Sequence, residues 1–563
     1  MYILGIWDGH DAGAAIAEGG VIKVAINEER LSKRKLDVGF PRLSIQACLN
    51  YLGLKPTDIN IVAASTSDFS KTLTRIFPSL KESYYLFRRR KIEKPRFVGL
   101  RRAFKYNTTT TGNLHGICKR ISEYYLKKEL KNLGLAGKLY IVDHHLAHAA
   151  GACYASGFSK ALCLTLDGVG DALSGSVNIF ENGAIKRIAE IPARDSIGIF
   201  FEQVTTLLGF RELEDEGKVM CMADYSYPIE DEKNRMMDFF SVDGLKLKAR
   251  FPATKMYSHI NRIVWNHPRE QVAYMAQRVL EKNLTKLFEN TLEETGLRNV
   301  CWAGGVAANV KANMRIRLLP QIKNWFVFPH MGDGGLAAGA ALYVSNLVEG
   351  TKPYRMADAY LGPEYSDDEI EDEIKKNKLK YEEGGDIAEH AADIISKENY
   401  VFWFQGRMEF GPRALGNRSI LAPAGSERIK DLLNIKVKKR EWYQPFCPSV
   451  LDTESRRLFK DVNGVDSFMT MAYMAKEDKV DGIKSVINVD GSSRPQMLQD
   501  ENKGYRRLLR QVKKNTGNGI VLNTSFNLHG FPIVLTPADA IDTMLKTNTR
   551  YMAMGNFFVE NKK

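Results

Sequence analysis

Two stretches of the chain share one pattern of apolar and polar positions. Residues 2–30 read YILGIWDGHDAGAAIAEGGVIKVAINEER, in which apolar runs are separated first by Asp8-Gly9 and then by a pair of glycines. Residues 161–191 repeat the pattern, with Asp167-Gly168 at the first break and Asn-Gly at the second. Short apolar runs bounded by such dipeptides predict strands joined by turns. Two copies about 160 residues apart predict a duplicated α/β unit.

Two further junctions predict a strand that leads through glycines into a helix. Residues 299–316 read NVCWAGGVAANVKANMRI, and residues 327–344 read VFPHMGDGGLAAGAALYV, with Asp333 between glycines. The free N–H groups of a helix start suit phosphate, and glycine lets the backbone approach a ligand closely. Paired Asp-Gly hairpins are also how actin-like and sugar-kinase-like ATP sites are built. Four such turns in one half of the chain therefore predict a site for an anionic ligand.

The polar and apolar pattern also divides the chain. A length of 563 residues exceeds what one hydrophobic core supports. Around residues 345–365 the sequence becomes polar and is interrupted by glycine and proline. We therefore predict a first domain at 1–350, a linker at 351–365 and a second α/β domain at 366–563.

Composition excludes several classes of protein. The chain is 44% apolar and 26% charged, as is typical of a globular protein, and no apolar run is long enough to span a bilayer. Asp8 comes too early for a signal peptide. The seven cysteines are scattered without a C-x-x-C pair, which argues for reduced thiols and against a zinc ribbon. We expect a cytoplasmic protein that does not contact a membrane.

The positive charge is concentrated. Of a formal net charge of +13, residues 81–105 contribute ten Lys and Arg against two Glu, with aromatic residues between them. This basic segment is interpreted either as a solvated insertion or as a binding surface for a polyanion such as RNA or a phosphorylated glycan.

Three histidines lie within VDHHLAHAA at 142–150. On a helix His144 and His148 share a face, whereas His145 points elsewhere. The small residues that follow let another backbone or a ligand approach, although most H-x-x-x-H pairs are structural. Carboxylates for the same ion are available from the glycine-rich turns, namely Asp8, Asp167 and Asp333. Two imidazoles with carboxylates suit Fe(II), Mn(II) or Zn(II), so a metal site is favoured.

Several motifs together resemble one family, the O-carbamoyltransferases of the nodulation-protein, cephalosporin and tobramycin type. The motifs run in order along nearly the whole chain and are GHDAGAA at 9–15, DHHLAHAA at 143–150, LDGVGD at 166–171, EGKVM at 216–220, AGGVAAN at 303–309, MGDGG at 331–335, EFGPRALGNRSILA at 409–422, VKKRE at 437–441 and LNTSFN at 522–527.

The resemblance implies an ATP-dependent enzyme of two α/β domains. The first would resemble the tRNA threonylcarbamoyl transferase, a relative of actin-like (ASKHA, duplicated ribonuclease-H-like) ATPases, and the second a YrdC-like domain. In the family, carbamoyl phosphate and ATP, with Mg(II), give carbamoyl adenylate in the second domain. The first domain then moves the carbamoyl group to a hydroxyl-bearing acceptor at a metal, typically Fe(II). The family also suggests a homodimer.

The resemblance assigns roles in the first domain by motif position. The implied metal ligands are His144, His148, Asp167 and Asp333, and the implied nucleotide-binding residues are Lys218, Gly304, Gly305, Asn309 and Gly334. His10 is the implied base for the acceptor hydroxyl, unless it only hydrogen-bonds Asp8 or Asp11 in its turn. Asn309 also suits a helix cap, and His145 a role in orienting its neighbours.

Activation of carbamoyl phosphate by ATP requires several cations in one pocket of the second domain. Arg413 and Arg418 stand in GPRALGNRS, and Lys438 and Arg440 stand in VKKREW, where we expect a strand with both side chains on one side. The family pattern adds Arg494, Asn523 and Ser525. Among all of these, Arg413 and Lys438 are taken as catalytic.

Other functions stay open at this point. The basic segment could hold an RNA whose nucleoside is the acceptor. A non-catalytic actin-like ATP-binding regulator would not need the histidine pair, Asp333 or the group of cations predicted in the second domain. A hydrogenase-maturation carbamoyltransferase would need acylphosphatase and zinc-finger segments ahead of these motifs.

Overall fold

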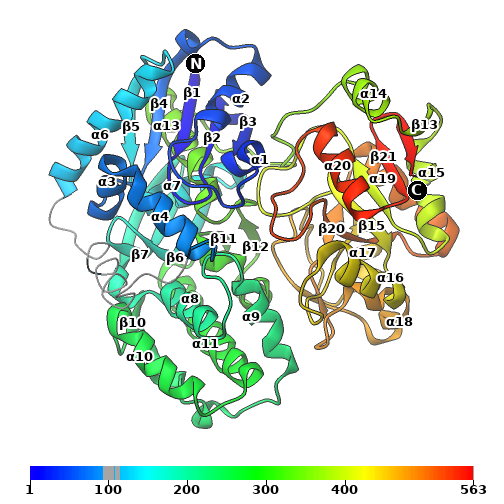
Figure 1. Ribbon diagram of the computed structural model, residues 1–563. Coiled ribbons are helices and arrows are strands. Elements are labelled where there is room, and N and C mark those ends of the chain that lie inside the picture. Colours follow the sequence, from blue (N-terminus) through cyan, green and yellow to red (C-terminus); the bar gives the residue numbers. More distant parts are fainter. Residues whose placement is uncertain (93–106, 108–114, 562–563) are drawn as a thin grey trace. The chain divides into compact units, whose positions relative to one another are not determined.

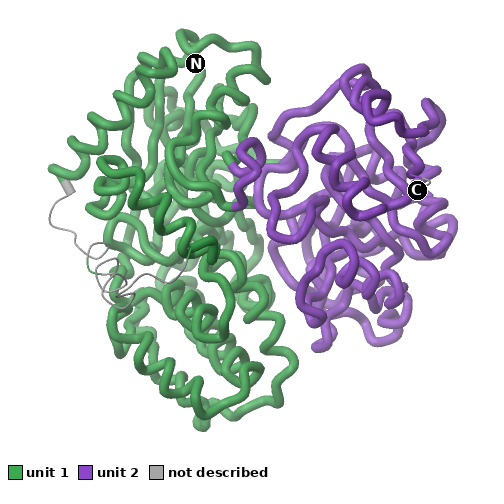
Figure 2. The backbone as a smooth tube through the Cα atoms, in the orientation of Figure 1, with its two compact units in different colours: residues 1–28, 36–356 green, residues 29–35, 357–563 purple. Residues whose placement is uncertain are grey.

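The computed structural model describes residues 1–92, 107 and 115–561, and it divides into two compact units (Figures 1 and 2). Unit 1 comprises residues 1–28 and 36–356, and unit 2 comprises residues 29–35 and 357–563. The short segment 29–35 was not foreseen in the second domain. Within unit 2 its Arg30 Nη2 donates to the Gly411 carbonyl at 2.9 Å, and its Lys33 pairs with Asp539.

The first sheet of unit 1 contains the predicted strands of residues 2–30. Its order is β3-β2-β1-β4-β5, in which β1, β2 and β3 are antiparallel while β4 and β5 run parallel to β1. The strands are β1 Tyr2–Trp7, β2 Gly13–Glu18, β3 Val21–Asn27, β4 Ile59–Ser65 and β5 Lys138–Val142.

The second sheet of unit 1 has the same topology, read as β8-β7-β6-β11-β12. Its strands are β6 Lys160–Gly170, β7 Leu173–Glu181, β8 Ala184–Pro192, β11 Asn299–Ala303 and β12 Asn324–Val327. The two sheets share the same strand order and the same pattern of parallel and antiparallel pairs, so unit 1 is a duplicated ribonuclease-H-like arrangement. The predicted duplication and actin-like fold are therefore confirmed.

The predicted turn at Asp167-Gly168 is wrong in detail, because β6 continues to Gly170. The β6–β7 ladder pairs regularly up to Leu166 and resumes only at Gly170, so Asp167 lies in an irregular stretch of the strand. Such a bulge leaves its extra residues out of the ladder and re-aims their side chains. Asp167 is thereby free to turn toward α7.

Helices α7 (His144–Ala155) and α13 (Leu336–Glu349) pack against each other in the middle of unit 1 (Figure 1). Helix α13 also packs on β1 and β2, and α7 on β6 and β11. The other elements of unit 1 are α2 Arg42–Leu52, α3 Phe69–Ile76, α4 Pro78–Arg88, α6 His115–Asn132, α8 Ile197–Leu207, α9 Glu216–Met222, β9 Phe240–Asp243, β10 Lys246–Ala249, α10 Ala253–Val264, α11 Arg269–Thr295 and α12 Val310–Arg317, while α1 Glu28–Ser32 enters unit 2.

The contact between α7 and α13 allows no side chain at Gly339. A Cβ there would lie 2.0 Å from the Ala147 carbonyl oxygen. Gly339→Ala should therefore lower the free energy of unfolding by about 1–3 kcal/mol, as overpacking typically does. Gly116→Ala on α6, where nothing lies within 4 Å of the added Cβ, is the control and should be neutral or slightly stabilising. Equal urea midpoints for both variants would contradict the tight packing.

Unit 2 is built on an eight-stranded sheet of order β13-β22-β21-β14-β15-β20-β16-β19. Its strands are β13 Lys380–Glu383, β14 Val401–Phe404, β15 Arg418–Pro423, β16 Cys447–Leu451, β19 Gln496–Leu498, β20 Ile520–Ser525, β21 Tyr551–Met554 and β22 Phe557–Glu560, with β17 Tyr473–Met474 and β18 Ser492–Ser493 forming a separate pair. The expected likeness to YrdC domains stays a prediction.

Helices α15 and α19 contact each other, and their apolar faces join the core of this sheet, which includes Trp403, Leu421 and Leu509. The helices are α14 Asp367–Lys376, α15 Ile387–Ser396, α16 Glu427–Leu432, α17 Asp452–Leu458, α18 Val480–Ile483, α19 Lys503–Thr516 and α20 Pro537–Thr547. Unit 2 is thus also of the mixed α/β class.

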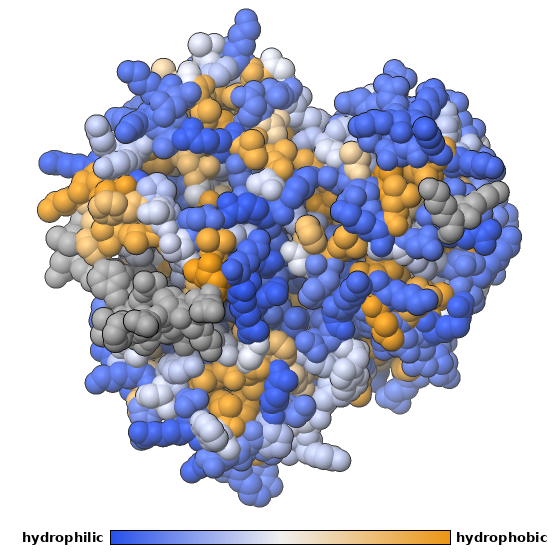
Figure 3. Space-filling view, viewed as in Figure 1, coloured by the Kyte–Doolittle hydropathy of each residue, from blue (hydrophilic) through white to orange (hydrophobic). Residues whose placement is uncertain are grey.

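The surface carries scattered apolar groups. On the face drawn in Figure 3, hydrophobic side chains form patches separated by hydrophilic ones. Among the described helices, none combines the length and the apolar character that crossing a membrane requires.

Candidate functional site

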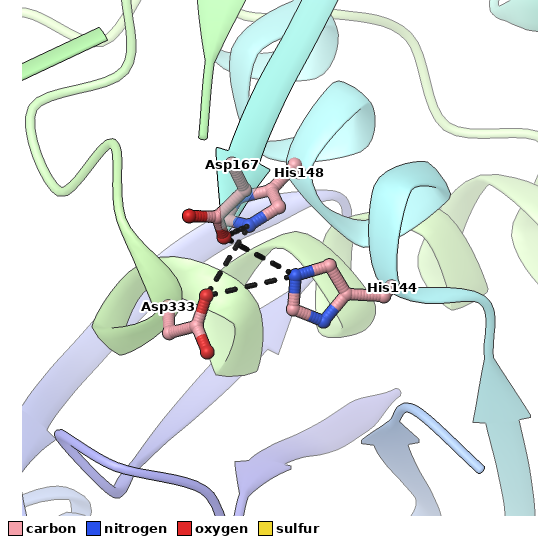
Figure 4. Close-up of side chains that lie close together, drawn as sticks. All are labelled: His144, His148, Asp167 and Asp333. Atoms are coloured by element: carbon pink, nitrogen blue, oxygen red, sulfur yellow. Dashed lines mark hydrogen bonds and ion pairs between the residues drawn. The ribbon is translucent and has the colours of Figure 1, made fainter. Parts of the chain in front are cut away.

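Four predicted ligands converge in unit 1 (Figure 4). His144 and His148 lie one turn apart at the start of α7, where Asp143 caps the helix by accepting from the Leu146 N–H at 2.9 Å. Asp167 comes from the irregular stretch of β6, and Asp333 from the turn before α13. One ligand atom from each of the four lies within 4.8 Å of the other three.

The distances fit one divalent ion. The Asp167 Oδ2 atom lies 3.1 Å from His148 Nε2 and 3.3 Å from His144 Nε2. Asp333 Oδ1 lies 3.6 Å from both nitrogens. Nitrogen and oxygen ligands bound at about 2.0–2.2 Å from a common ion are separated by similar distances. The donor set of two imidazoles and two carboxylates suits Fe(II), Mn(II) or Zn(II).

The neighbours of His144 orient it for this role. Its Nδ1 atom is hydrogen-bonded to Thr66 Oγ1 at 2.9 Å, which directs Nε2 toward the carboxylates. Burial lowers the pKa of His144, but Asp333 and Asp167 outweigh it and raise that pKa to about 9. The carboxylates thus create a place where positive charge is stabilised, whether as a proton or as a metal ion.

His145 points away from this cluster, as its position on the helix predicted. Its Nδ1 is hydrogen-bonded to Thr165 Oγ1 at 2.9 Å and its Nε2 to the Leu173 carbonyl at 3.2 Å. It therefore fixes α7 against β6 and β7.

His10 adjoins the cluster through Asp333, because its Nδ1 lies 3.4 Å from Asp333 Oδ2. Burial lowers the pKa of His10 to about 4, against the opposing effect of Asp333. The imidazole is therefore neutral near pH 7 and able to accept a proton. Asp8, considered as a further carboxylate for the ion, is instead paired with Arg75 at 2.9 Å and Lys71 at 2.6 Å.

Local packing explains why glycine is needed at the positions that the family pattern assigns to a nucleotide. Gly304 has a φ of 95°, and a Cβ there would lie 2.1 Å from the Leu166 carbonyl oxygen. The Gly305 N–H donates to Asp167 Oδ1 at 3.2 Å, which helps to hold that ligand. A Cβ at Gly334 would lie 2.2 Å from the His330 ring. These glycines let the turns around the histidine and aspartate cluster approach one another.

The other nucleotide candidates lie at two helices. Asn309 caps α12, since its Oδ1 accepts from the Ala312 N–H at 3.1 Å, and the predicted cap is confirmed. Lys218 on α9 pairs with Asp215 at 3.1 Å. Nucleotide binding by either residue stays a prediction.

Part of the basic segment turns inward. Arg88 and Arg89 are buried, Arg89 pairs with Glu214, and Lys81 donates to the Asp8 carbonyl at 2.7 Å. A solvated insertion does not describe Arg88 and Arg89, because both are buried. Binding of a polyanion by the segment stays a prediction. Residues 93–105 of the segment lie outside the described part of the chain.

Unit 2 gathers most of the predicted cations near one end of its sheet. Lys438 is buried, and its Nζ donates to Ser525 O at 2.6 Å, Ser525 Oγ at 3.1 Å and Asn527 Oδ1 at 2.5 Å. Burial, followed by the charge of Arg440, lowers the pKa of Lys438 well below its usual value.

The expected strand at VKKRE is wrong. Residues 433–438 form a π-helical turn, and Lys439 is left-handed with a φ of 43°. The turn lets Lys438 bury its amine against the end of β20, which an alternating strand would not do. Arg440 nevertheless lies close enough to Lys438 to affect its pKa. Its Nε donates to Asn434 Oδ1 at 2.7 Å.

Arg418 is fully buried at the start of β15, with its guanidinium 3.6 Å from the Phe404 ring centroid. Its Nη1 donates to the Gln405 carbonyl at 2.6 Å, whereas its Nε and Nη2 have no hydrogen-bond partner among the described residues. Burial lowers its pKa to about 10. The Nε and Nη2 atoms of this buried guanidinium thus remain available as hydrogen-bond donors.

The remaining candidates lie around β16 and β20. Asn523 donates to the Ala414 carbonyl at 3.1 Å, next to Arg413, and it pairs in register with Cys447. Arg494 Nη2 lies 2.9 Å from Cys447 Sγ, so it belongs to the same neighbourhood.

Sequence reasoning missed two supporting residues. Glu409 Oε1 accepts from the N–H groups of Leu415, Asn417 and Arg418. It so shapes the arginine loop, by which we mean residues 412–418 with their two arginines. It lies within a recognised motif, whereas Thr66, the partner of His144, lies in a stretch with no motif or periodic signal.

Comparison with known proteins identifies the class. Residues 2–342 match the family model described as "Carbamoyltransferase N-terminus", and residues 392–561 match "Carbamoyltransferase C-terminus". The protein is therefore a group-transfer enzyme. It belongs to the carbamoyltransferase family, which confirms the resemblance drawn from the motifs.

Individual relatives agree over most of the chain. An uncharacterized protein of Methanocaldococcus jannaschii is 32% identical over 97% of this chain and 93% of its own length. Nodulation protein NolNO of Sinorhizobium fredii is 32% identical over 98% of this chain and 79% of its own. The solved structure of HypF from T. kodakarensis covers 62% of this chain and 48% of its own, at 16% identity and a TM-score of 0.34.

Proposed function

We propose that the protein is an ATP-dependent O-carbamoyltransferase that first makes carbamoyl adenylate and then transfers its carbamoyl group to a hydroxyl. One observation carries the proposal. In a member of the carbamoyltransferase family, two histidines and two aspartates converge within 4.8 Å, and a neutral histidine contacts one of the aspartates.

The activation step is assigned to unit 2. One carbamoyl phosphate, one ATP and one water give carbamoyl adenylate, phosphate and pyrophosphate. Several anionic groups must meet in this step, so bidentate and point-charge cations are needed. The buried Arg418 and Lys438 support this assignment, as does the buried Nε of Arg494, which has no hydrogen-bond partner among the described residues. Arg413 and Arg440 complete the cationic group, with Asn523 and Ser525 as polar partners, and Mg(II) would accompany ATP.

The transfer step is assigned to unit 1. His144, His148, Asp167 and Asp333 would hold Fe(II) or another divalent ion, which would stabilise the negative charge that develops on the carbamoyl oxygen. The acceptor oxygen attacks the carbamoyl carbon, AMP leaves, and the hydroxyl proton passes to His10 Nε2. The neutral state of His10 suits it to receive that proton.

Binding of the adenylate in unit 1 is assigned to Lys218, Gly304, Gly305, Asn309 and Gly334. The support is the start of α12 beside the Gly304 turn, since free N–H groups at helix starts suit phosphate. The residue assignments come from the family's motifs.

The proposal is tested without an acceptor. The protein, ATP, Mg(II) and carbamoyl phosphate are incubated, and the expected products are pyrophosphate and carbamoyl adenylate in equal amounts, detected by mass spectrometry. Omission of carbamoyl phosphate is the control and should abolish both products. Bound ATP without adenylate would contradict the proposal and favour a non-catalytic ATP-binding protein.

A further inference from the structure

A cluster of four positively charged side chains, three of them buried, lies near His10 in unit 1. We name it the cationic cluster and define it as Lys71 and Arg75 of α3 with Lys81 and Arg88 of α4. Arg75 Nε and Nη2 each donate to an Asp8 carboxylate oxygen at 2.9 Å, and Lys71 Nζ lies 2.6 Å from Asp8 Oδ1. One carboxylate is therefore already shared by two cations.

Lys81 and Arg88 have no carboxylate partner among the described residues. Lys81 Nζ donates to the Asp8 main-chain carbonyl at 2.7 Å. Arg88 is 5% exposed. Among the described residues, its Nη2 has only a long hydrogen bond of 3.4 Å to the Leu36 carbonyl, and its Nη1 has no hydrogen-bond partner. Burial of unpaired charge is costly unless an opposite charge compensates it. The cluster thus holds more positive charge than its own carboxylate neutralises.

Other side chains of α4 and of the residues that follow it bind a second segment of unit 1. Tyr84 donates to Glu212 Oε1 at 2.5 Å, and Arg89 pairs with Glu214. Arg90 Nη2 donates to the Gly209 carbonyl at 2.5 Å. Other side chains of this segment therefore bind residues 209–214, whereas Lys81 and Arg88 have no carboxylate partner among the described residues.

The cationic cluster lies one aromatic ring away from the histidine and aspartate cluster. The Trp7 ring centroid is 4.2 Å from Lys71 Nζ, 5.9 Å from Lys81 Nζ and 5.9 Å from the His144 ring centroid. Trp7 Nε1 also donates to the His10 carbonyl at 2.7 Å. The charges of Lys81 and Arg88 both act on the His10 imidazole, so the two cations lie near it. A hydroxyl compound placed at His10 is therefore also near these two cations.

We propose that Lys81 and Arg88 bind an oxyanion, either a carboxylate or a phosphate, carried by the hydroxyl compound that accepts the carbamoyl group. The proposal rests on the transfer role assigned to unit 1 and narrows the acceptor to an anionic class. Charge-assisted hydrogen bonds from a guanidinium and an ammonium are the strongest available to an anion. The pKa of Lys81, which burial and then Lys71 lower well below its usual value, would rise again once the anion is bound.

Titration calorimetry without ATP or carbamoyl phosphate tests this independently of catalysis. Three probes share one scaffold: glucuronate, glucose 6-phosphate and glucose. At least one anionic probe should bind about tenfold or more tightly than glucose. Tighter binding of glucuronate would indicate an acceptor with a carboxylate, and tighter binding of glucose 6-phosphate an acceptor with a phosphate. Equal affinities for all three probes, including no measurable binding of any, would overturn the proposal even if carbamoyl adenylate is formed.

Variants test whether Lys81 and Arg88 cause the higher affinity for an anionic probe. Lys81→Met and Arg88→Gln should each reduce the anion's advantage over glucose by about tenfold. Lys91→Gln is the matched control, because Lys91 is exposed on the same segment. If the anionic probe still binds more tightly than glucose by the same factor in both variants, the proposal is overturned. Lys81→Arg keeps the charge and should retain most of the advantage, which guards against a folding defect in Lys81→Met.

ATP serves as a fourth titrant. Because ATP also carries phosphates, the cationic cluster could recognise the nucleotide. A tenfold loss of ATP affinity in Lys81→Met and Arg88→Gln, with unchanged affinity for the sugar anions, would assign the anion to the nucleotide and reject an anionic acceptor.

Discussion

His148→Ala should leave the protein with almost no bound divalent metal and lower the rate of carbamoyl transfer by at least about a hundredfold. Loss of a residue that only supports a metal ligand typically costs 10–100-fold, so loss of a ligand should cost no less. His148 Nε2 lies 3.1 Å from Asp167 Oδ2 and 3.6 Å from Asp333 Oδ1. Its removal would leave a single imidazole to share the ion with two carboxylates.

Metal analysis of protein purified without air and reloaded with Fe(II) measures the first effect. His259→Ala is the control, because this histidine stacks on Phe251 away from the cluster. Carbamoyl adenylate formation in unit 2 should be unchanged in His148→Ala, which separates the transfer step from the activation step. Full metal content and transfer activity in His148→Ala would refute the site.

Lys438→Met should reduce the rate of carbamoyl adenylate formation by about a hundredfold to a thousandfold, the range for removal of one charge-stabilising donor. The Lys438 amine is held by Ser525 and Asn527 at the end of β20, close to Arg440. Methionine has a similar volume without the charge, so the fold of the turn should survive. Release of pyrophosphate measures the effect.

Lys436→Met is the matched control for this prediction. Lys436 lies in the same π-helical turn as Lys438, but its side chain is exposed. A normal rate in Lys436→Met with a low rate in Lys438→Met assigns the effect to the buried amine. Equal rates of carbamoyl adenylate formation in both variants would mean that Lys438 only holds the Ser525 carbonyl in place and does not stabilise charge in the reaction.

The sequence predicted those features of the structure that depend on residues close together in the chain. Alternating apolar runs and Asp-Gly breaks predicted both sets of three strands in unit 1, and the spacing of His144 and His148 placed them on one helix face. The motifs named four ligands, and the structure brings their donor atoms together. Each of these signals lies within a few residues of the feature that it predicts.

Features that depend on distant contacts were not predictable in this way. Asp8 stood in a motif that favoured metal binding, but its partners come from α3, more than sixty residues later. The strand expected at VKKRE failed because burial of the Lys438 amine outweighed the alternation of the sequence. Thr66 contacts His144 across 78 positions of the chain, and no periodicity encodes such a pair.

The assignment of residues 29–35 to unit 2 has a consequence for dissecting the protein. The backbone passes from one unit to the other after residues 28, 35 and 356, so no single cleavage releases unit 2 whole. A gene fragment that starts at residue 357 would encode a sheet without Arg30, and the Gly411 carbonyl beside the arginine loop would lose its guanidinium donor. The two units are thus encoded as interleaved segments, and a stable split version would have to supply residues 29–35 as a separate or permuted piece.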